Sequence, residues 1–283
     1  MSLLETTTSS TSTSTPSYSA PASPAVIPDV QSQRDRRQIP IDQVGIRDLR
    51  HPLLFVDRSG TPTPVVGRFQ MTVGLPAHAK GTHMSRFVDL LGNLSGPLSL
   101  ANFENFLREM LRRLEATSGR LEISFPWFVT KTAPVSRTRS LLDYQVKLTG
   151  EINESDAFEL RLEVVVPVTS LCPCSKEISD RGAHNQRSHI TVDARLDAPV
   201  WIEEILELVE KEASCELFGL LKRPDEKWVT ERAYDNPKFV EDLVRDVAAS
   251  LARDGRVKGF AVESENFESI HNHSAWARID RLG

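Results

Sequence analysis

The chain has 283 residues, 40% of them hydrophobic, which is enough for one large core or two modest ones. Its formal net charge is −5 and no run of Lys or Arg stands out, so we expect neither a nucleic acid nor a membrane as a partner. Three cysteines are too few, and odd in number, for a disulfide framework, which predicts reduced thiols and a cytoplasmic location. No stretch of 18 apolar residues is present, so no membrane-spanning helix is predicted.

Residues 1–35 are predicted to be a disordered tail. The first 25 residues contain 14 Ser or Thr and three Pro, and Glu5 is their only charged residue. Such a segment cannot bury enough apolar surface to offset the entropy that it loses on ordering. We expect the folded part to begin near Ile39 or Val44; a docking arm is the alternative role for the tail.

Residues 36–170 are predicted to form a first unit of strands and one helix. Apolar and polar side chains alternate in most of its short segments, as a strand with one buried face requires. Apolar residues then recur at helical spacing from Leu100 to Leu114, with Ser99 as a cap and Gly119 past the end. The predicted strands are 53–56, 68–75, 121–127, 142–148 and 158–168.

Residues 171–283 repeat this plan loosely. We predict a strand at 190–196, a helix from Trp201 to about Leu221, and a second helix over 237–253 that is capped by Asn236. Cys215 would lie in the core on the first of these helices. Strands near 257–264 and 273–279 end the chain. Two similar halves indicate an α+β duplication with antiparallel sheets that are covered on one face.

Residues that bind metals or transfer protons concentrate in three predicted connections. Thiolate and imidazole suit zinc or iron, and a carboxylate adds manganese to the choice. The spacing matches neither paired CxxC units nor HExxH, so the residues alone leave open that Cys172 is a small side chain packed after a strand. The three connections read CPCSKEISDRGAHNQRS (172–188), KRPDEK (222–227) and ESENFESIHNH (263–273).

The run CPCSKEIS followed by GAHNQRS closely resembles the type IB GTP cyclohydrolase I family, and so do three further segments: GTHMSRFVDLL, LKRPDEKWVTERAYDNPKFVED and ESENFESIHNHSAWA. The resemblance covers roughly residues 40–283. It implies tandem tunnelling-fold (T-fold) units, with a first unit at 36–170 and a second at 171–283 that carries most of the active site. It also implies β-barrels that form on assembly of a homotetramer, with active sites at subunit interfaces.

The resemblance further implies a hydrolase that converts GTP and water to 7,8-dihydroneopterin triphosphate and formate, the first step of folate and pterin biosynthesis. The family depends on a divalent metal ion, and zinc, manganese and iron(II) are the candidates here. A bound divalent cation lowers the pKa of its water to about 7, which suits an attack on the electron-poor purine C8. The metal-associated positions of the family match Cys172, His184 and Glu226. Of these three, Cys172 is also expected to be a catalytic residue.

The remaining roles follow from the same resemblance and from the chemistry of each side chain. His271 fits a general acid and base, His273 would share or support that role, and Glu268 would orient one of them. Glu241 could accept two hydrogen bonds from the guanine edge. The candidates for the triphosphate are Lys176, Arg187, Arg137, Arg139 and His83. Ordinary loop histidines and solvated surface charges remain the alternatives.

Two other functions stay open at this point. One is another tunnelling-fold enzyme of purine or pterin chemistry, such as a nitrile reductase that uses its cysteine as a nucleophile and NADPH as reductant. The other is a metal- or pterin-binding module without catalysis. Metal content and formate release would separate the three.

Overall fold

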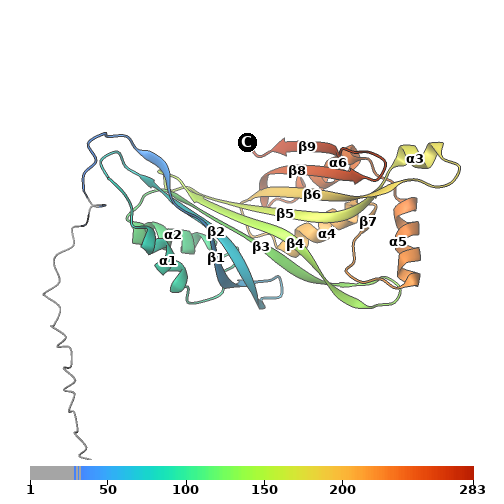
Figure 1. Cartoon of the computed structure of the whole chain (residues 1–283), viewed down its shortest axis with the longest axis horizontal. Helices are drawn as coiled ribbons and strands as arrows, with labels where there is room; N and C mark the ends of the chain where they lie inside the picture. Colours follow the sequence, from blue (N-terminus) through green and yellow to red (C-terminus); the bar gives the residue numbers. More distant parts are fainter. Residues whose placement is uncertain (1–28, 30, 32) are drawn as a thin grey trace, which may run out of the picture.

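The computed structural model describes residues 29, 31 and 33–283, so most of the predicted tail lies outside the described residues. Within this part the strands form one nine-stranded sheet in the order β1-β2-β3-β4-β5-β6-β8-β9, with the short β7 attached to β5 (Figure 1). Arg34 and Asp35, which we placed in the tail, pair with the loop after β2. No helix of the described residues is long and apolar enough to cross a membrane.

All pairings within the sheet are antiparallel, as the alternating pattern predicts. The predicted strands are confirmed, and most of them are longer than the apolar core of each pattern because polar residues continue the pairing at both ends. The strands are β1 (Ile41–Val56), β2 (Pro62–Leu75), β3 (Gly119–Thr132), β4 (Arg139–Ile152), β5 (Phe158–Leu171), β6 (Asn185–Leu196), β7 (Cys215–Glu216), β8 (Val257–Glu268) and β9 (Ala275–Arg281).

Helices cover one face of the sheet. In Figure 1, α1 and α2 lie below the strands at one end of the molecule, α4 lies beside β4 and β5, α6 lies against β8 and β9, and α3 and α5 lie at the far end. The helices are α1 (Met84–Gly92), α2 (Phe103–Leu114), α3 (Pro173–Ile178), α4 (Ile202–Glu212), α5 (Arg223–Asp235) and α6 (Val240–Leu251).

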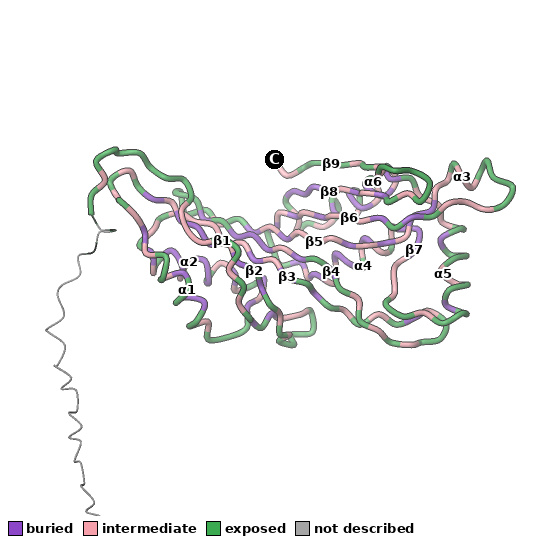
Figure 2. Tube along the Cα trace, in the orientation of Figure 1, coloured by how far each residue is buried: buried purple, intermediate pink, exposed green. Residues whose placement is uncertain are grey.

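A single hydrophobic core runs between these helices and the sheet. On β5, every second residue from Leu160 to Val168 is buried, and the helix-facing residues of its neighbours follow the same alternation (Figure 2). The opposite face carries cross-strand ion pairs, for example Lys147 with Glu163 at 2.8 Å and Arg278 with Glu263 at 3.3 Å. The sheet therefore has one apolar, covered face and one charged face.

Three details of the second half differ from the sequence prediction. The helix that begins after Trp201 ends at Glu212 rather than near Leu221, because the chain then turns into β7 beside β5. Cys215 is fully buried as predicted, but it lies on β7, and burial raises the pKa of its thiol to about 12. Asn236 caps no helix start; it follows the end of α5, and α6 begins after Phe239.

Three helices were not predicted. The segment after His83 forms α1, Pro173–Ile178 within the predicted connection 172–188 forms α3, and α5 begins at Arg223 in the predicted connection 222–227. The order strand-strand-helix-helix-strand-strand occurs from β1 to β4 and again from β5 to β9, with α3, β7 and α5 added in the second copy. The boundary between units at 170/171 stays a prediction; it falls at the end of β5, whereas the order of elements repeats after β4.

The sheet forks between β4 and β5. The two strands pair only as far as Gln145 and Val165, and beyond that point β7 takes the place of β4 beside β5. The strand β5 therefore carries Leu171 and Cys172 to the far end of the molecule without support from β4.

Candidate functional site

Three strand ends meet at one edge of the second half and bring two of the predicted loops together. Leu171, the last residue of β5, is opposite Asn185 at the start of β6, and the next residue of β6, Gln186, is opposite Glu268 at the end of β8. We call this place the catalytic edge, after the role that the sequence predicts for the residues beside it. It lies beside α3 (Figure 1).

Cys172 is held at the start of α3. Pro173 occupies the first position of this helix, where its missing N–H and fixed φ do no harm, and Cys172 is the residue before it. The backbone N–H of Ser175 donates to the Cys172 sulfur at 3.5 Å. The backbone N–H of Cys172 donates to the His184 carbonyl oxygen at 3.4 Å.

The Ser175 hydroxyl ties the same two segments together from the other side. It donates to the Cys172 carbonyl oxygen at 3.2 Å and accepts from the His184 backbone N–H at 3.1 Å. The structure thus brings two of the predicted metal ligands, Cys172 and His184, into one small loop arrangement.

The imidazole of His184 fits a metal-binding role. Its Nδ1 is buried and has no hydrogen-bond partner among the described residues. A thiol and an imidazole with a free nitrogen are donors that zinc and iron(II) accept. The residues present at the catalytic edge therefore fit the predicted metal, although they supply only two ligands.

The third predicted ligand is not at the catalytic edge of this chain. Glu226 is exposed in the first turn of α5, whereas α3 contacts the last turn of α5 through Lys176 and Tyr234. Eight residues separate Glu226 from Tyr234, which is about 12 Å along a helix. Accordingly, the described residues contain no group of three or more His, Cys, Asp or Glu that could hold a metal ion.

The predicted proton-transfer residues lie together after β8. The His271 Nε2 is 3.5 Å from a carboxylate oxygen of Glu268, and the rings of His271 and His273 stack with centroids 5.0 Å apart. Both histidines lie in the connection before β9 rather than in the strand predicted from 273, yet their rings still face the same way. Glu268 therefore lies beside a histidine that it was predicted to orient, and the role itself stays a prediction.

Glu241 lies near the same edge. It is exposed in the first turn of α6, while its neighbour Asp242 accepts the Phe239 backbone N–H at 3.0 Å. The backbone N–H of Lys238 donates to the Leu171 carbonyl oxygen at 3.0 Å, which fixes the start of α6 beside the end of β5. The guanine-binding candidate is therefore carried by an element that touches the residue before Cys172.

The predicted phosphate-binding cations are dispersed. Lys176 donates to the Tyr234 carbonyl oxygen at 2.5 Å and lies 4.2 Å from its ring centre, so its ammonium already binds α5. Arg187 lines a cavity of about 320 Å³ on the charged face together with His189; burial lowers the pKa of His189, and the charge of Arg187 lowers it further. His83 lies in the first half, where it contacts Asp29 at 3.4 Å.

Arg137 and Arg139 belong to the β3–β4 hairpin, and a residue that we did not predict holds this hairpin. The fully buried Asp225 accepts the backbone N–H groups of Val135 and Ser136 with one carboxylate oxygen and that of Lys222 with the other, each at 2.8 Å. Asp225 thus joins the hairpin to the start of α5. The Pro-Asp pair at a helix start was a signal for such a cap.

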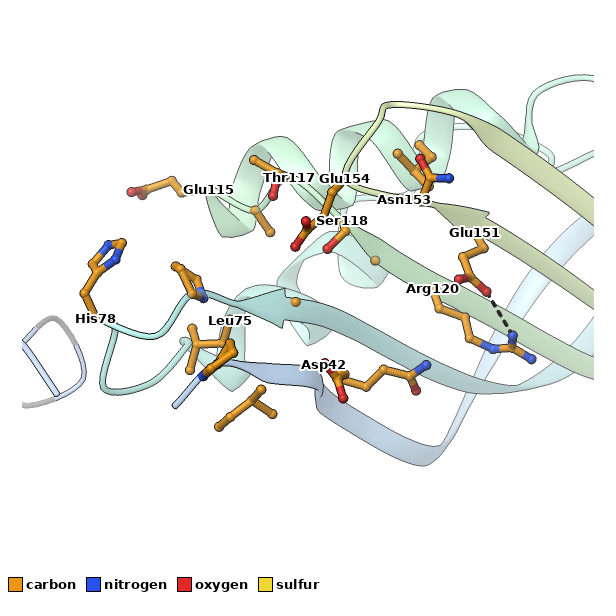
Figure 3. Close-up of a pocket in the computed structure, with 18 residues that line it drawn as sticks. Asp42, Leu75, His78, Glu115, Thr117, Ser118, Arg120, Glu151, Asn153 and Glu154 are labelled. Carbon is orange, nitrogen blue, oxygen red and sulfur yellow. Dashed lines mark hydrogen bonds and ion pairs between the residues drawn. The ribbon is translucent and has the colours of Figure 1, made fainter. Parts of the chain in front are cut away.

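Large cavities also lie elsewhere in the molecule. Two adjoining cavities of about 580 and 560 Å³ occupy the far end of the first half and share Leu75, His78 and Glu115. Figure 3 shows that the wall of the larger one carries several carboxylates and the ion pair of Arg120 with Glu151 at 3.2 Å. These two cavities are therefore separate from the catalytic edge.

Comparison with known families adds an independent finding. Residues 27–277 match a family model described as "Type I GTP cyclohydrolase folE2". The chain is 60% identical over 264 residues to a GTP cyclohydrolase FolE2 from Nitrosococcus oceani, covering 92% of this chain and 98% of that protein. It is 59% identical over 255 residues to the FolE2 of an Azoarcus species, covering 90% and 95%.

Solved structures give more distant likenesses. A hyperthermostable urate oxidase variant from Bacillus sp. TB-90 has a TM-score of 0.49 at 10% identity, covering 85% of this chain and all of that one. The uricase of Arthrobacter globiformis has a TM-score of 0.46 at 9% identity, covering 86% and 94%. Because both TM-scores are below 0.5, nothing about this chain follows from them.

Proposed function

This chain belongs to the type I GTP cyclohydrolase folE2 family, and we propose that it converts GTP and water to 7,8-dihydroneopterin triphosphate and formate. Identity of about 60% over most of the chain carries the assignment as a GTP cyclohydrolase of folate and pterin biosynthesis. The catalytic edge supports the reaction, because it gathers a thiol, a carboxylate and three imidazoles from separate loops.

The metal would be held by Cys172 and His184. When bound, a divalent cation such as zinc, manganese or iron(II) supplies Lewis acidity and makes water a nucleophile near neutral pH. Glu226, which this chain does not bring to Cys172, would join them in the assembled homotetramer. The support for this set is the sulfur at the start of α3 and the unpaired Nδ1 of His184.

Proton transfer is assigned to His271, with Glu268 as its orienting partner. Ring opening, hydrolysis of the resulting formamide and rearrangement of the sugar each require a group that both accepts and donates protons. An imidazole does this near neutral pH, and a neighbouring carboxylate stabilises its protonated form. The stacked ring of His273 supports the position of His271.

Glu241 would bind the guanine edge by accepting from N1–H and the N2 amino group, which adenine lacks. Arg187, Arg137, Arg139, Lys176 and His83 would bind the triphosphate. Since His83 lies in the first half and the hairpin cations lie at the start of α5, a complete site needs more than one copy of the chain. We therefore also propose tandem T-fold units that close into barrels in a cytoplasmic homotetramer, with sites between subunits.

The test is direct. Purified protein is loaded with zinc, manganese or iron(II) and incubated with GTP, and pterin fluorescence and formate are followed. Formation of both products is expected. Absence of product with all three metals would contradict the cyclohydrolase, NADPH consumption without formate would indicate a nitrile reductase, and metal uptake without any turnover would indicate a binding module.

A further inference from the structure

The core contains a cluster of buried polar side chains beneath the catalytic edge. Among the described residues, ten polar or charged residues are buried, and six of these belong to the β5, β6 and β8 ends or to the segment that covers them. Five of the six are hydrogen-bonded within the chain: Ser170 with Ser188 at 2.6 Å, Ser264 with Asn266 at 3.2 Å, and Ser214 with the Leu171 backbone N–H at 3.2 Å. The sixth is Gln186.

Gln186 has an unpaired, buried amide oxygen. Its side chain lies on the helix-covered face of β6, the residue is 7% exposed, and Oε1 has no hydrogen-bond partner among the described residues. A buried acceptor without a donor destabilises the protein relative to an apolar side chain of similar size. In the protein at work, a donor from another source would have to reach it.

The neighbours of Gln186 indicate what that donor is. His184 lies two residues earlier, just before β6 begins, and its Nδ1 is also buried and has no hydrogen-bond partner among the described residues. Glu268 is the register partner of Gln186 on β8, and Ser170, two residues before Cys172, is its partner on β5. Gln186 therefore lies at the centre of the residues assigned to chemistry.

We propose that Gln186 is a substrate-contacting residue, and that its buried amide oxygen accepts a hydrogen bond from an N–H or O–H of the bound purine nucleotide. The inference rests on the proposed function, because a nucleotide on which Cys172, His184 and Glu268 act has to lie over this rung of the sheet. A site that holds an unpaired acceptor ready for a substrate donor also rejects ligands that lack the donor.

The test uses Gln186→Met, which keeps the length of the side chain and removes both polar atoms. Removing an unpaired buried acceptor should raise the Tm of the full-length, metal-loaded protein by about 2 °C or more. The same change should lower kcat/KM for GTP at least about tenfold, because the substrate donor is then left unpaired. Opposite signs for stability and activity are not expected from a residue that only supports the fold.

Thr72→Val is the matched control. Thr72 lies on β2 in the first half, is 8% exposed, and its Oγ1 is another of the buried atoms without a partner among the described residues. Its replacement should raise the Tm in the same way and leave kcat/KM within about twofold of wild type.

A Tm at or above wild type together with a loss of at least tenfold in kcat/KM supports the proposal. It is overturned if Gln186→Met lowers the Tm by several degrees, since the amide would then be bonded inside the free protein. It is also overturned if kcat/KM stays within twofold. Failure of the wild-type protein to turn over GTP would instead refute the proposed function.

Discussion

Asp225 should stabilise the fold only while it is ionised, because its two carboxylate oxygens accept hydrogen bonds from two different segments. One oxygen accepts from the β3–β4 hairpin and the other from the start of α5. Asp225→Asn keeps one oxygen and presents an NH₂ group where the second oxygen was, so the amide N–H on that side loses its acceptor. A buried N–H without a partner costs about 1–3 kcal/mol.

For a chain of this size, a loss of about 2 kcal/mol corresponds to a fall in Tm of about 4–8 °C. Asp57→Asn is the matched control. Asp57 holds the β1–β2 turn with three hydrogen bonds that all end on one oxygen, from the backbone N–H groups of Ser59 and Thr61 and from the Ser59 hydroxyl. An asparagine can keep all three, so its Tm should change by no more than about 2 °C.

The pH dependence of this Tm difference tests whether the ionised form of Asp225 is the stabilising one. Burial raises the pKa of Asp225, but hydrogen bonds from Ser136, Lys222 and Val135 outweigh it and hold the pKa well below the usual 3.8. A folded-state pKa below the unfolded one contributes stability that is present above the unfolded value and is lost as the pH falls through the folded value. The Tm difference between wild type and Asp225→Asn should therefore be constant from pH 8 to 5 and shrink below pH 3.8.

Thermal unfolding followed by circular dichroism across this pH range measures the effect, and GTP turnover at 25 °C measures its functional consequence. We expect turnover to fall as well, since the same carboxylate positions the hairpin of Arg137 and the turn of Glu226. A Tm for Asp225→Asn equal to wild type at pH 7, or a Tm difference that grows on acidification, would refute the reasoning.

Three further outcomes are expected. Cys172→Ala should lose bound metal by elemental analysis and abolish turnover, whereas the exposed Cys174→Ala should retain both; equal activity in the two variants would move the metal site elsewhere. Glu241→Gln should leave the Tm nearly unchanged, because the side chain is exposed, and lower kcat/KM for GTP at least about tenfold; an unchanged kcat/KM would remove Glu241 from the guanine site. Treatment with a chelator should stop formate release, and added zinc, manganese or iron(II) should restore it, while turnover that persists in the chelator would exclude a metal-dependent mechanism.

The strands were predictable because each buries one face against the same core, so apolar and polar residues alternate along its sequence. The helices were less predictable, because burial against the core does not always produce a helical pattern and can also continue such a pattern beyond the helix. The pattern that begins at Trp201 continues to Cys215, which is buried, but it is buried as part of β7 beside β5. In α5 only Asp225 and Ala233 are buried, so the helix has almost no apolar face. Its sequence therefore lacks the helical spacing of apolar residues that would have predicted it.

The candidate site was predicted where motif residues sit on neighbouring strand ends. Cys172, His184, Glu268 and His271 converge because β5, β6 and β8 are adjacent in the sheet. The proposed role of Gln186 was not predicted, because an amide at the start of a strand resembles any other polar residue until its burial and its missing partner are known. Glu226 and His83 could not be placed by spacing, because their distance from Cys172 depends on where α5 and the first half lie.

The order of strands in the sheet has a consequence for how the chain folds. From β1 to β6 each strand pairs with its neighbour in sequence, so a chain leaving the ribosome can complete the first four strands, with α1 and α2, before the second half has been synthesised. The catalytic edge differs, because it requires Leu171, Asn185 and Glu268 at once, and β8 is the last strand but one. We therefore expect the catalytic edge to form only at the end of synthesis, when the first half of the chain is already folded.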